Sequence, residues 1–505
     1  MQKLPREIVG YGPVRSYEAS SGGKAGIRSK VLANLDAAIA ACGLKDGDTV
    51  SFHHHLRNGD AVLNLVMVAL ARRGLKNLQV AASSIFPVHA PLVAHMCSGT
   101  VDRLSTSFIS GPVGEAISSG LLGKPVVLTS HGGRARALDE GALKIDVAFV
   151  AAPAADALGN ISGRMGPNAC GTLGYPLTDV DVAERVVAVT DRLVPFPVAA
   201  IDIPQNKVDF VVAVDRIGDQ GGIASGTTQP SDDPVSLAIG ESAAAVIAAS
   251  GLLREGFSFQ TGAGSVSLRT AEAVGREMAT SGIRGSFCAG GITGQHVKML
   301  QSGLFETLMD VQCFDLEAVA SYQRDVRHQA MSAAAYAGPH VGGAVVDRVD
   351  AVVLGAAEVD HAFNVNVTTK ADGVIIGGSG GHADAAAGSR LTLVTTRLTA
   401  AGFAKIVPDV GHVTTPGTTV DVLVTDAGIA VNPKRADLAD RLKQAGLPVV
   451  RIETLADMAA ERATRKRPPR AAGRIVAVSE YRDGSVIDVV RQIERDEEPQ
   501  QRTPA

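Results

Sequence analysis

Thr49-Val50-Ser51-Phe52 is a short apolar segment that follows the polar turn Lys45-Asp46-Gly47-Asp48, and this pattern predicts a buried β-strand. Residues 28–42, before the turn, place alanine and larger apolar residues at helical spacing. Residues 234–260 repeat this helix, turn and strand. A repeated unit of this kind indicates that the fold contains two copies of one domain.

Other segments follow the same repeat. The aligned segments are Ser51-Phe52 with Ser258-Phe259 and Gln79–Ile85 with Ser286–Ile292, both at an offset of 207 residues, and 145–160 with 349–364 at an offset of 204. Apolar strands alternate with helices in both halves, which is typical of mainly parallel sheets covered by helices on both faces. We therefore predict an α/β fold with two related open, mainly parallel-sheet domains that arose by internal duplication.

Glycine, proline and charge mark the predicted domain limits. Residues 461–474 include a basic segment, 465–470, which we interpret as a solvated surface loop because no aromatic residue is interleaved with it. The predicted units are an N-terminal domain at 1–215, a linker at 216–233, a C-terminal domain at 234–460, an extension at 461–492 and a disordered tail at 493–505.

Composition excludes several classes of function. The 505-residue chain is 46% hydrophobic and 20% charged, and its net charge of −4 argues against binding to nucleic acid. No apolar run has the length of a membrane span. The five cysteines are widely spaced and form no C-x-x-C pair, so we expect reduced thiols in a cytoplasmic protein and no metal site.

Glycine-rich and basic segments follow the predicted strands. Gly262-Ala263-Gly264 comes after one strand, and Gly377-Gly378-Ser379-Gly380-Gly381 comes after residues 374–376, which we also expect to be a strand. Such loops can bind an anion through backbone N–H groups, although a tight turn explains them equally well. His53-His54-His55 alternates faces and makes a poor zinc site, whereas Arg57 and Arg134 suit a polycarboxylate or are ordinary charges.

Several longer strings together resemble the citrate lyase α chains, a family related to the CoA-transferases. The strings are Asp48-Thr49-Val50-Ser51-Phe52-His53-His54-His55, Gly290-Gly291-Ile292-Thr293-Gly294, Phe363-Asn364-Val365-Asn366-Val367, Gly378-Ser379-Gly380-Gly381-His382-Ala383-Asp384 and 424–433. The resemblance extends from about Gly12 to Gln492. Covalent CoA-transferases carry a Glu-Asn-Gly segment where this chain has Ala289-Gly290-Gly291, so the resemblance implies transfer through a ternary complex without an acyl-enzyme.

The resemblance implies that the chain transfers an acyl carrier from an acetyl thioester to citrate, as the α subunit of a complex with a lyase β subunit and an acyl carrier γ subunit. We also expect a homo-oligomer and no permanently bound cofactor, because the acyl thioester of the carrier's prosthetic group, or of CoA, is a substrate. The candidate catalytic residues are Gly290, Gly291 and Glu358. The candidate citrate-binding residues are His53, Arg57 and Arg134. The residues expected to bind CoA or the acyl carrier are Gly262, Ala263, Gly264, Gly378, Gly380 and Gly381.

Other functions remain open at this point. Glu358 could be the nucleophile of a thioester hydrolase, or of a covalent CoA-transferase acting on another acid such as citramalate, or it could be a structural acid. A duplicated metabolite-sensing domain without enzymatic activity is a further alternative. Such sensors carry a helix-turn-helix domain at the N-terminus, and the segment before Ser29 is too short and insufficiently basic for one.

Overall fold

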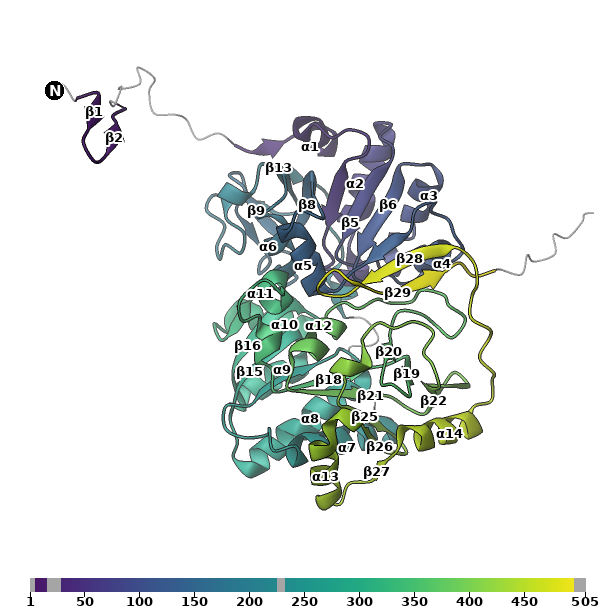
Figure 1. Cartoon of the computed structure of the whole chain (residues 1–505). Helices are drawn as coiled ribbons and strands as arrows, with labels where there is room; N and C mark the ends of the chain where they lie inside the picture. Colours follow the sequence, from purple (N-terminus) through teal and green to yellow (C-terminus); the bar gives the residue numbers. More distant parts are fainter. Residues whose placement is uncertain (1–4, 16–28, 225–231, 495–505) are drawn as a thin grey trace, which may run out of the picture.

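Two large β-sheets, each with its own helices, form the body of the protein (Figure 1). The computed structural model describes residues 5–15, 29–224 and 232–494. The predicted linker 216–233 and tail 493–505 therefore fall partly outside the described residues. Two small strands near the N-terminus, β1 (Glu7–Ile8) and β2 (Gly12–Pro13), pair with each other and not with either large sheet.

The first sheet has ten strands, and all neighbours are parallel except the β28–β29 hairpin. Its order is β29 (Val486–Arg491), β28 (Ile475–Glu480), β7 (Val126–Leu128), β6 (Val101–Thr106), β5 (Leu78–Ala82), β4 (Thr49–Phe52), β8 (Val147–Ala152), β11 (Arg185–Thr190), β13 (Phe210–Ala213) and β3 (Val31–Leu32). Every residue of β8 is buried, as expected for a central parallel strand covered on both faces.

The second sheet has nine strands, parallel except where β25 meets β26. Its order is β17 (His328–Ala330), β16 (Phe305–Cys313), β15 (Gly285–Ile292), β14 (Ser258–Thr261), β18 (Ala351–Gly355), β21 (Leu391–Thr395), β25 (Val422–Thr425), β26 (Gly428–Val431) and β27 (Val449–Val450). The predicted pair of related, mainly parallel sheets is confirmed.

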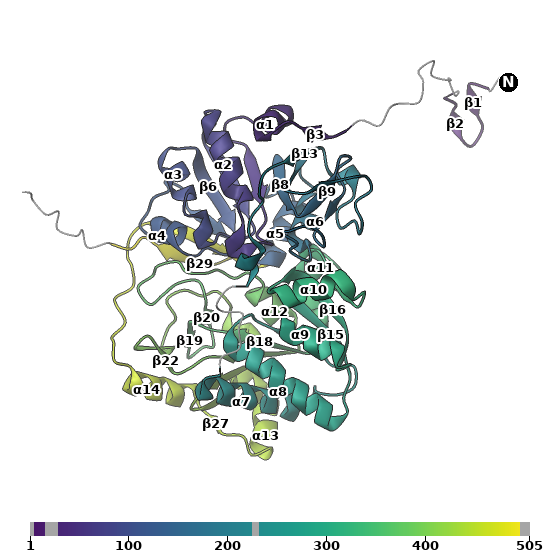
Figure 2. The ribbon, with the colours of Figure 1, turned by 180° about the vertical axis from the view of Figure 1, so that it is seen from behind.

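Fourteen α-helices are present in the described residues. They are α1 (Leu35–Cys42), α2 (Val62–Arg72), α3 (Leu92–Cys97), α4 (Pro112–Ser118), α5 (His131–Asp139), α6 (Gly174–Asp179), α7 (Pro234–Ala249), α8 (Ser265–Ser281), α9 (Gly294–Gln301), α10 (Leu316–Arg324), α11 (Ala333–Ala337), α12 (His382–Gly388), α13 (Ala436–Gln444) and α14 (Ile452–Arg462). The long helices α7 and α8 lie side by side against the second sheet (Figure 2).

Equivalent contacts in the two halves support the duplication. His89 and His296, 207 residues apart, each accept a hydrogen bond at Nδ1 from the backbone N–H three residues earlier. Each half also has a three-stranded side sheet: β10 (Ile161–Ser162), β9 (Ala154–Asp156) and β12 (Leu193–Val194) in the first, and β20 (Val365–Asn366), β19 (Glu358–Asp360) and β24 (Ile406–Val407) in the second. The loops at Asp156–Asn160 and Asp360–Asn364 make matching side-chain hydrogen bonds.

Three predictions about local structure need correction. Residues 29–34 are not helical, because the Asn34 side chain accepts from Ala37 N and caps α1 there; Arg28 lies outside the described residues. Residues 374–376 make only an isolated bridge, between Ile375 and Thr369. The strands β4 and β14 match at an offset of 209 residues rather than 207. In β4 the Thr49 N–H donates to Asp146, and in β14 the Ser258 N–H donates to Asp350, so Thr49 and Ser258 are equivalent.

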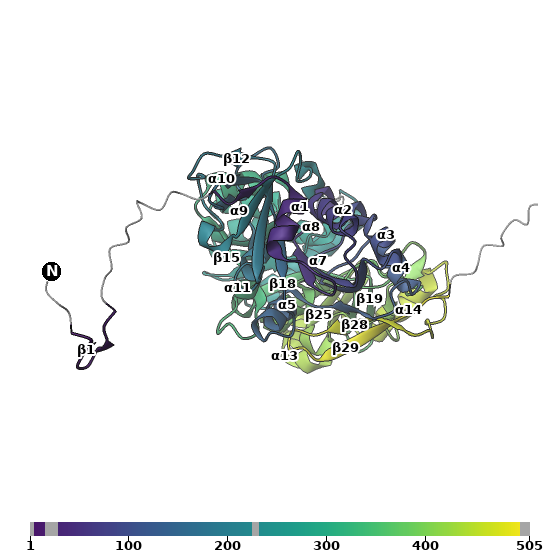
Figure 3. The same cartoon turned by 90° about the horizontal axis from the view of Figure 1, so that it is seen from above.

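The C-terminal extension returns to the first half of the molecule. After α14 the chain crosses to the first sheet, where β28 pairs in parallel with β7. Figures 1 and 3 show this hairpin, in yellow, next to α4. The predicted extension at 461–492 thus contains the strands β28 and β29, and the sequence did not indicate which sheet they would join.

Candidate active site

The carboxyl ends of the two large sheets meet at the boundary between the halves. His53 and His54 follow β4 of the first sheet, and Gln312 lies near the end of β16 in the second. The Gln312 side chain donates from Nε2 to the backbone oxygen of His54 at 2.9 Å. Open α/β sheets bind ligands at the carboxyl ends of their strands, so this boundary is the candidate site.

Three rings from the first half pack together there. The ring centres of His54 and His131 lie 4.7 and 4.6 Å from that of Tyr175. The Tyr175 hydroxyl also hydrogen-bonds His131 Nε2 at 2.8 Å. Burial lowers the pKa of His131 to about 3 and the pKa of His54 well below its usual value. Both imidazoles are therefore neutral at pH 7, and each offers one donor and one acceptor.

The second half contributes Gln260 and Tyr336. Gln260 donates from Nε2 to the Tyr336 hydroxyl at 2.7 Å, and burial raises the pKa of that hydroxyl. Within the described part of the chain, several buried polar atoms at this boundary have no hydrogen-bond partner: His131 Nδ1, Gln260 Oε1, Gln312 Oε1 and Ser107 Oγ. A buried unsatisfied polar group costs about 1–3 kcal/mol. Because these atoms come from both halves, a polar ligand bound at the boundary could satisfy them together.

The predicted glycine loop joins the halves at this point. Gly380 donates from N to the Ser107 oxygen at 3.1 Å, and its own oxygen accepts from His131 N at 2.8 Å. A β-carbon at Gly378 would lie 2.3 Å from the Ser107 oxygen, and one at Gly381 would lie 2.7 Å from the Tyr336 hydroxyl. Close packing, with the first half at Gly378 and within the second half at Gly381, thus explains these glycines, and their contact with CoA or the carrier stays a prediction.

Asp384, in α12, holds the start of α5. Its two carboxylate oxygens accept from Ser130 Oγ at 2.8 Å and from Gly132 N at 2.9 Å. Ser130 is also the N-cap of α5, accepting from Gly133 N. Burial raises the pKa of Asp384 to about 6, against the opposing effect of these hydrogen bonds. The contacts fix His131, the first residue of α5, relative to the second half.

His53 and Arg134 lie together away from the boundary rings. Arg134 donates from Nη2 to Asp179 Oδ2 at 2.6 Å and to the Ala81 oxygen at 3.2 Å. His53 Nε2 lies 3.5 Å from the same Asp179 oxygen, and burial lowers the pKa of His53 to about 4. The side chains of Arg134 and Asp179 are only 3% and 1% exposed. The predicted citrate contacts of His53 and Arg134 remain predictions: Arg134 is already ion-paired with Asp179, whereas neither ring nitrogen of His53 has a hydrogen-bond partner in the described residues.

Arg57 lies at the boundary itself. Its guanidinium carbon is 5.4 Å from the ring centre of Phe86, in the first half, and 4.6 Å from that of Phe314, in the second. Burial lowers the pKa of Arg57 to about 10, which leaves the side chain charged at neutral pH. Its backbone adopts a φ of 54°, a strained conformation for a non-glycine residue, and such strain is concentrated at functional sites.

The other predicted glycines lie at strand ends of the second sheet. Gly262-Ala263-Gly264 leads from β14 into α8, whose N-cap, Gly264, offers no side-chain bond. A β-carbon at Gly291 would lie 2.0 Å from the Phe314 ring, so glycine there admits the ring that Arg57 covers. Gly290 has a φ of 95° and lies against the Gln260 side chain. Both turns are therefore adjacent to the site, and their contacts with substrate are not established.

Glu358 is in β19, away from the boundary rings. Its Oε2 atom accepts from Asn366 Nδ2 at 3.1 Å, from Gly411 N at 3.0 Å and from Arg467 Nη2 at 3.0 Å. A carboxylate oxygen held by three donors is stabilised as an anion and is a poorer nucleophile. This environment suits a structural acid, and whether Glu358 is catalytic remains a prediction.

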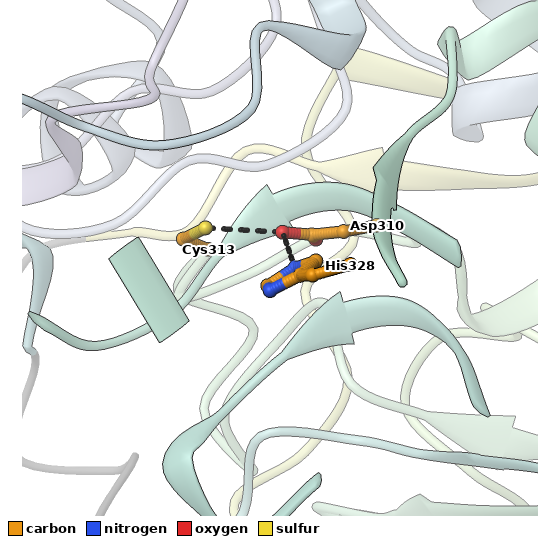
Figure 4. A group of neighbouring side chains, drawn as sticks. All are labelled: Asp310, Cys313 and His328. Carbon is orange, nitrogen blue, oxygen red and sulfur yellow. Dashed lines mark hydrogen bonds and ion pairs between the residues drawn. The ribbon is translucent and has the colours of Figure 1, made fainter. Parts of the chain in front are cut away.

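A buried cluster of Asp310, Cys313 and His328 has side chains of metal-binding type (Figure 4). Asp310 Oδ2 accepts from Cys313 Sγ and from His328 Nε2, both at 3.0 Å. Burial raises the pKa of the Cys313 thiol well above its usual value, so the thiol keeps its proton. Because metals bind the thiolate, hydrogen bonding explains the cluster, and the expectation of no metal stays a prediction.

Comparisons with known proteins decide the family. The family model for the α subunit of citrate lyase matches residues 28–493. The citrate lyase α chain of Escherichia coli K12 is 47% identical over 481 residues, which are 95% of this chain and 94% of that protein. The chain belongs to the citrate lyase α subunit family.

Solved structures agree with this assignment. A crystal structure described as the α subunit of citrate lyase from Streptococcus mutans, in complex with citrate, superposes with a TM-score of 0.91 at 43% identity and covers 97% of this chain and 99% of that one. A 4-hydroxybutyrate CoA-transferase from Porphyromonas gingivalis superposes with a TM-score of 0.53 at 17% identity, covering 85% and 97% of the two chains, and shares the fold alone. The chain therefore has a CoA-transferase-type fold, as predicted.

The sequence did not single out the residues that meet at the boundary. His131, Tyr175, Gln260 and Tyr336 are absent from the predicted site residues. One available signal was the capping serine that places His131 at a helix start.

No described helix has both the length and the apolar character needed to cross a membrane.

Proposed function

We propose that this citrate lyase α chain transfers the acyl carrier from its acetyl thioester to citrate, giving the citryl thioester and acetate. Membership of the family supports the citrate reaction and lends no support to the hydrolase alternative. The observation that carries the proposal is the buried boundary site, where a cation and unsatisfied polar atoms face each other between the two halves. A small polyanion matches this combination of charge and hydrogen-bonding groups.

The reaction balances without removal of a proton from carbon. A citrate carboxylate attacks the thioester carbonyl, and the carbon–sulfur bond breaks. The carrier is released as a thiolate, and citrate and acetate are then joined as a mixed anhydride. The thiolate then attacks the citryl carbonyl and acetate departs. Holding both reactants in one site can supply about 7–11 kcal/mol, so positioning is the main contribution of the protein.

Arg57 and His131 have the leading roles in this proposal. Arg57 binds a citrate carboxylate through its charged, forked guanidinium. If the Tyr175 hydroxyl donates to His131 Nε2, then Nδ1 carries the ring hydrogen and can donate to the substrate. Backbone N–H groups of Gly262-Ala263-Gly264, at the start of α8, and of Gly290-Gly291 stabilise the developing oxyanion, at about 3–4 kcal/mol for each good donor.

Two positions, Ala289 and Glu358, support transfer through a ternary complex. Ala289 is fully buried in β15 at the position where covalent relatives carry glutamate, and a methyl group cannot attack a thioester. Glu358 is the other candidate, and its hydrogen bonds with Asn366, Gly411 and Arg467 favour a structural role. We infer that no acyl-enzyme forms.

The wider assignments belong to the same proposal. We infer that the chain acts in the cytoplasm as a homo-oligomer within a complex that also contains a lyase β subunit and an acyl carrier γ subunit. Cleavage of the citryl thioester would then be the task of the β subunit.

The decisive assay mixes the purified chain with acetyl-CoA, as a surrogate for the carrier, and with citrate or citramalate in turn. Mass spectrometry should detect citryl-CoA and acetate, without oxaloacetate. Initial-rate plots should intersect, since parallel lines would indicate an enzyme-bound acyl group. Absence of citryl-CoA, or inactivation by borohydride only after acetyl-CoA is added, would overturn the corresponding part of the proposal.

A further inference from the structure

A cavity lies beside Glu358, on the side of the second half where the chain leaves for the first sheet. Its volume is about 630 Å³. It is bordered by β19, by the β22 (Thr399–Ala400) and β23 (Phe403–Ala404) hairpin, and by residues 465–468, which follow α14. The basic segment 465–470 is therefore not simply a solvated loop, because half of it forms a wall of this cavity.

The charge of the lining is positive. Four cations, Lys370, Lys405, Arg465 and Lys466, line the cavity with only two carboxylates, Glu358 and Asp372. Glu358 is moreover ion-paired with Arg467, which lies outside this lining. Several cations that converge with little compensation attract a multiply charged anion.

The basic wall is held in place by specific contacts. The Arg465 guanidinium lies 4.5 Å from the ring centre of Phe403, and the Arg465 backbone N–H donates to the Gly402 oxygen at 2.9 Å. Arg467 donates to Glu358 and to the Asp409 oxygen, and its Nε atom is buried without a hydrogen-bond partner in the described residues. Burial lowers the pKa of Lys405 to about 8. Arg465 and Arg467 are thus held in place by their contacts, and Lys405 is partly desolvated.

The cavity is connected to the active site by a short stretch of chain. Ile376 lines the cavity, and Gly380, four residues later, hydrogen-bonds the backbone of His131. Four extended residues span at most about 14 Å. A pantetheine arm is long enough to extend from phosphates in this cavity to a thioester beside His131.

We propose that this cavity binds the phosphate groups of the thioester substrate, either in CoA or in the prosthetic group of the carrier. The inference rests on the proposed transfer function, and it adds the group that anchors the thioester far from its reacting end. The citrate carboxylates bind elsewhere, at Arg57. Binding at a remote anchor contributes to positioning of the reacting carbonyl.

The test compares thioesters with and without phosphates. Arg465→Gln combined with Lys466→Gln removes two cations, and Lys443→Gln, at an exposed position of α13, is the matched control. We expect the double variant to raise the KM for acetyl-CoA about tenfold or more, since charge-assisted bonds to phosphate are among the stronger ones. The KM for citrate and the rate with acetyl-pantetheine should not change. Adenosine 3′,5′-bisphosphate should compete with acetyl-CoA in the wild type and not in the double variant.

Each outcome separates the two proposals. An unchanged KM for acetyl-CoA, or an equal change with acetyl-pantetheine, overturns the phosphate site and leaves transfer to citrate intact. Failure of the wild type to make citryl thioester from either compound overturns the proposed function instead. An acetylated carrier protein is the last substrate to test. If the double variant loses affinity for both the acetylated carrier and acetyl-CoA, the site binds the prosthetic group of the carrier. If it loses affinity for acetyl-CoA alone, the site binds free CoA.

Discussion

His53 and His54 are adjacent, yet they belong to two different clusters. His53 faces Asp179 and Arg134, all within the first half, where an ion pair occupies the buried charges. His54 packs on Tyr175, next to His131, against the second half, where donors and acceptors lack partners in the described residues. Both clusters are buried, and burial lowers the pKa of His53 and of His54. The difference is charge pairing and position: the first cluster holds a buried ion pair within one half, whereas the second places neutral polar atoms, without partners in the described structure, between the two halves, where a ligand can bind.

The largest expected effect tests the cluster that holds the buried ion pair of Arg134 and Asp179. Arg134→Met leaves Asp179 buried without its cation, which should lower the free energy of unfolding by about 3–5 kcal/mol. Urea denaturation measures this loss. Adding Asp179→Leu should recover most of the stability, because no charge then remains unpaired. A stable Arg134→Met protein with a selectively raised KM for citrate would instead support the sequence-based assignment of Arg134 as a citrate contact.

The sequence could predict the strand that carries both histidines and the alternation of their faces. Strand composition, the polar turn and the repeat also indicated the two parallel sheets, because these are local patterns. The partners of the histidines could not be found in this way. Asp179 and Tyr175 come from α6, and Gln312 and Tyr336 come from the other half, so their positions depend on how the halves pack. The same reason hid the return of β28 to the first sheet.

The second prediction divides the two ring nitrogens of His131. Glutamine can place its amide near Nε2, which bonds Tyr175, whereas asparagine can place its amide near Nδ1, which lacks a partner in the described structure. If Nδ1 donates to the reacting oxygen, His131→Gln should lower kcat about 10²–10³-fold, and His131→Asn should retain more activity. Thermal unfolding of both variants controls for loss of fold. The reverse order of activity would assign the catalytic contact to Nε2.

Asp384 offers a pH test of the link between the boundary and the fold. Its folded pKa, about 6, exceeds the unfolded value of 3.8, so the folded state binds the proton more tightly. Stability from this group is therefore greatest below pH 4, falls by about 3 kcal/mol as the pH rises through 6, and is constant above that. Asp384→Asn should remove this fall. The difference between wild-type and variant unfolding curves at pH 4, 5, 6 and 7 isolates it from the histidines, and parallel pH profiles would contradict the assignment.

The smallest effect is expected at Arg57, and it sharpens the comparison most directly. Arg57→Lys keeps the positive charge at the boundary while removing the planar fork that suits a carboxylate. We expect the KM for citrate to rise about tenfold, or about 1.4 kcal/mol, with the KM for acetyl-CoA unchanged. Arg134→Lys is the matched control, because it makes the same chemical change in the ion-paired cluster, where only stability should respond. If both lysine variants raised the KM for citrate alike, both clusters would contribute to citrate binding, and the buried ion pair would no longer distinguish them. If Arg57→Lys raised only the KM for the thioester, Arg57 would bind the acyl thioester rather than citrate. The citrate contacts would then lie among Gln260, Gln312 and His131, because each of them has a polar atom without a partner at this boundary in the described structure.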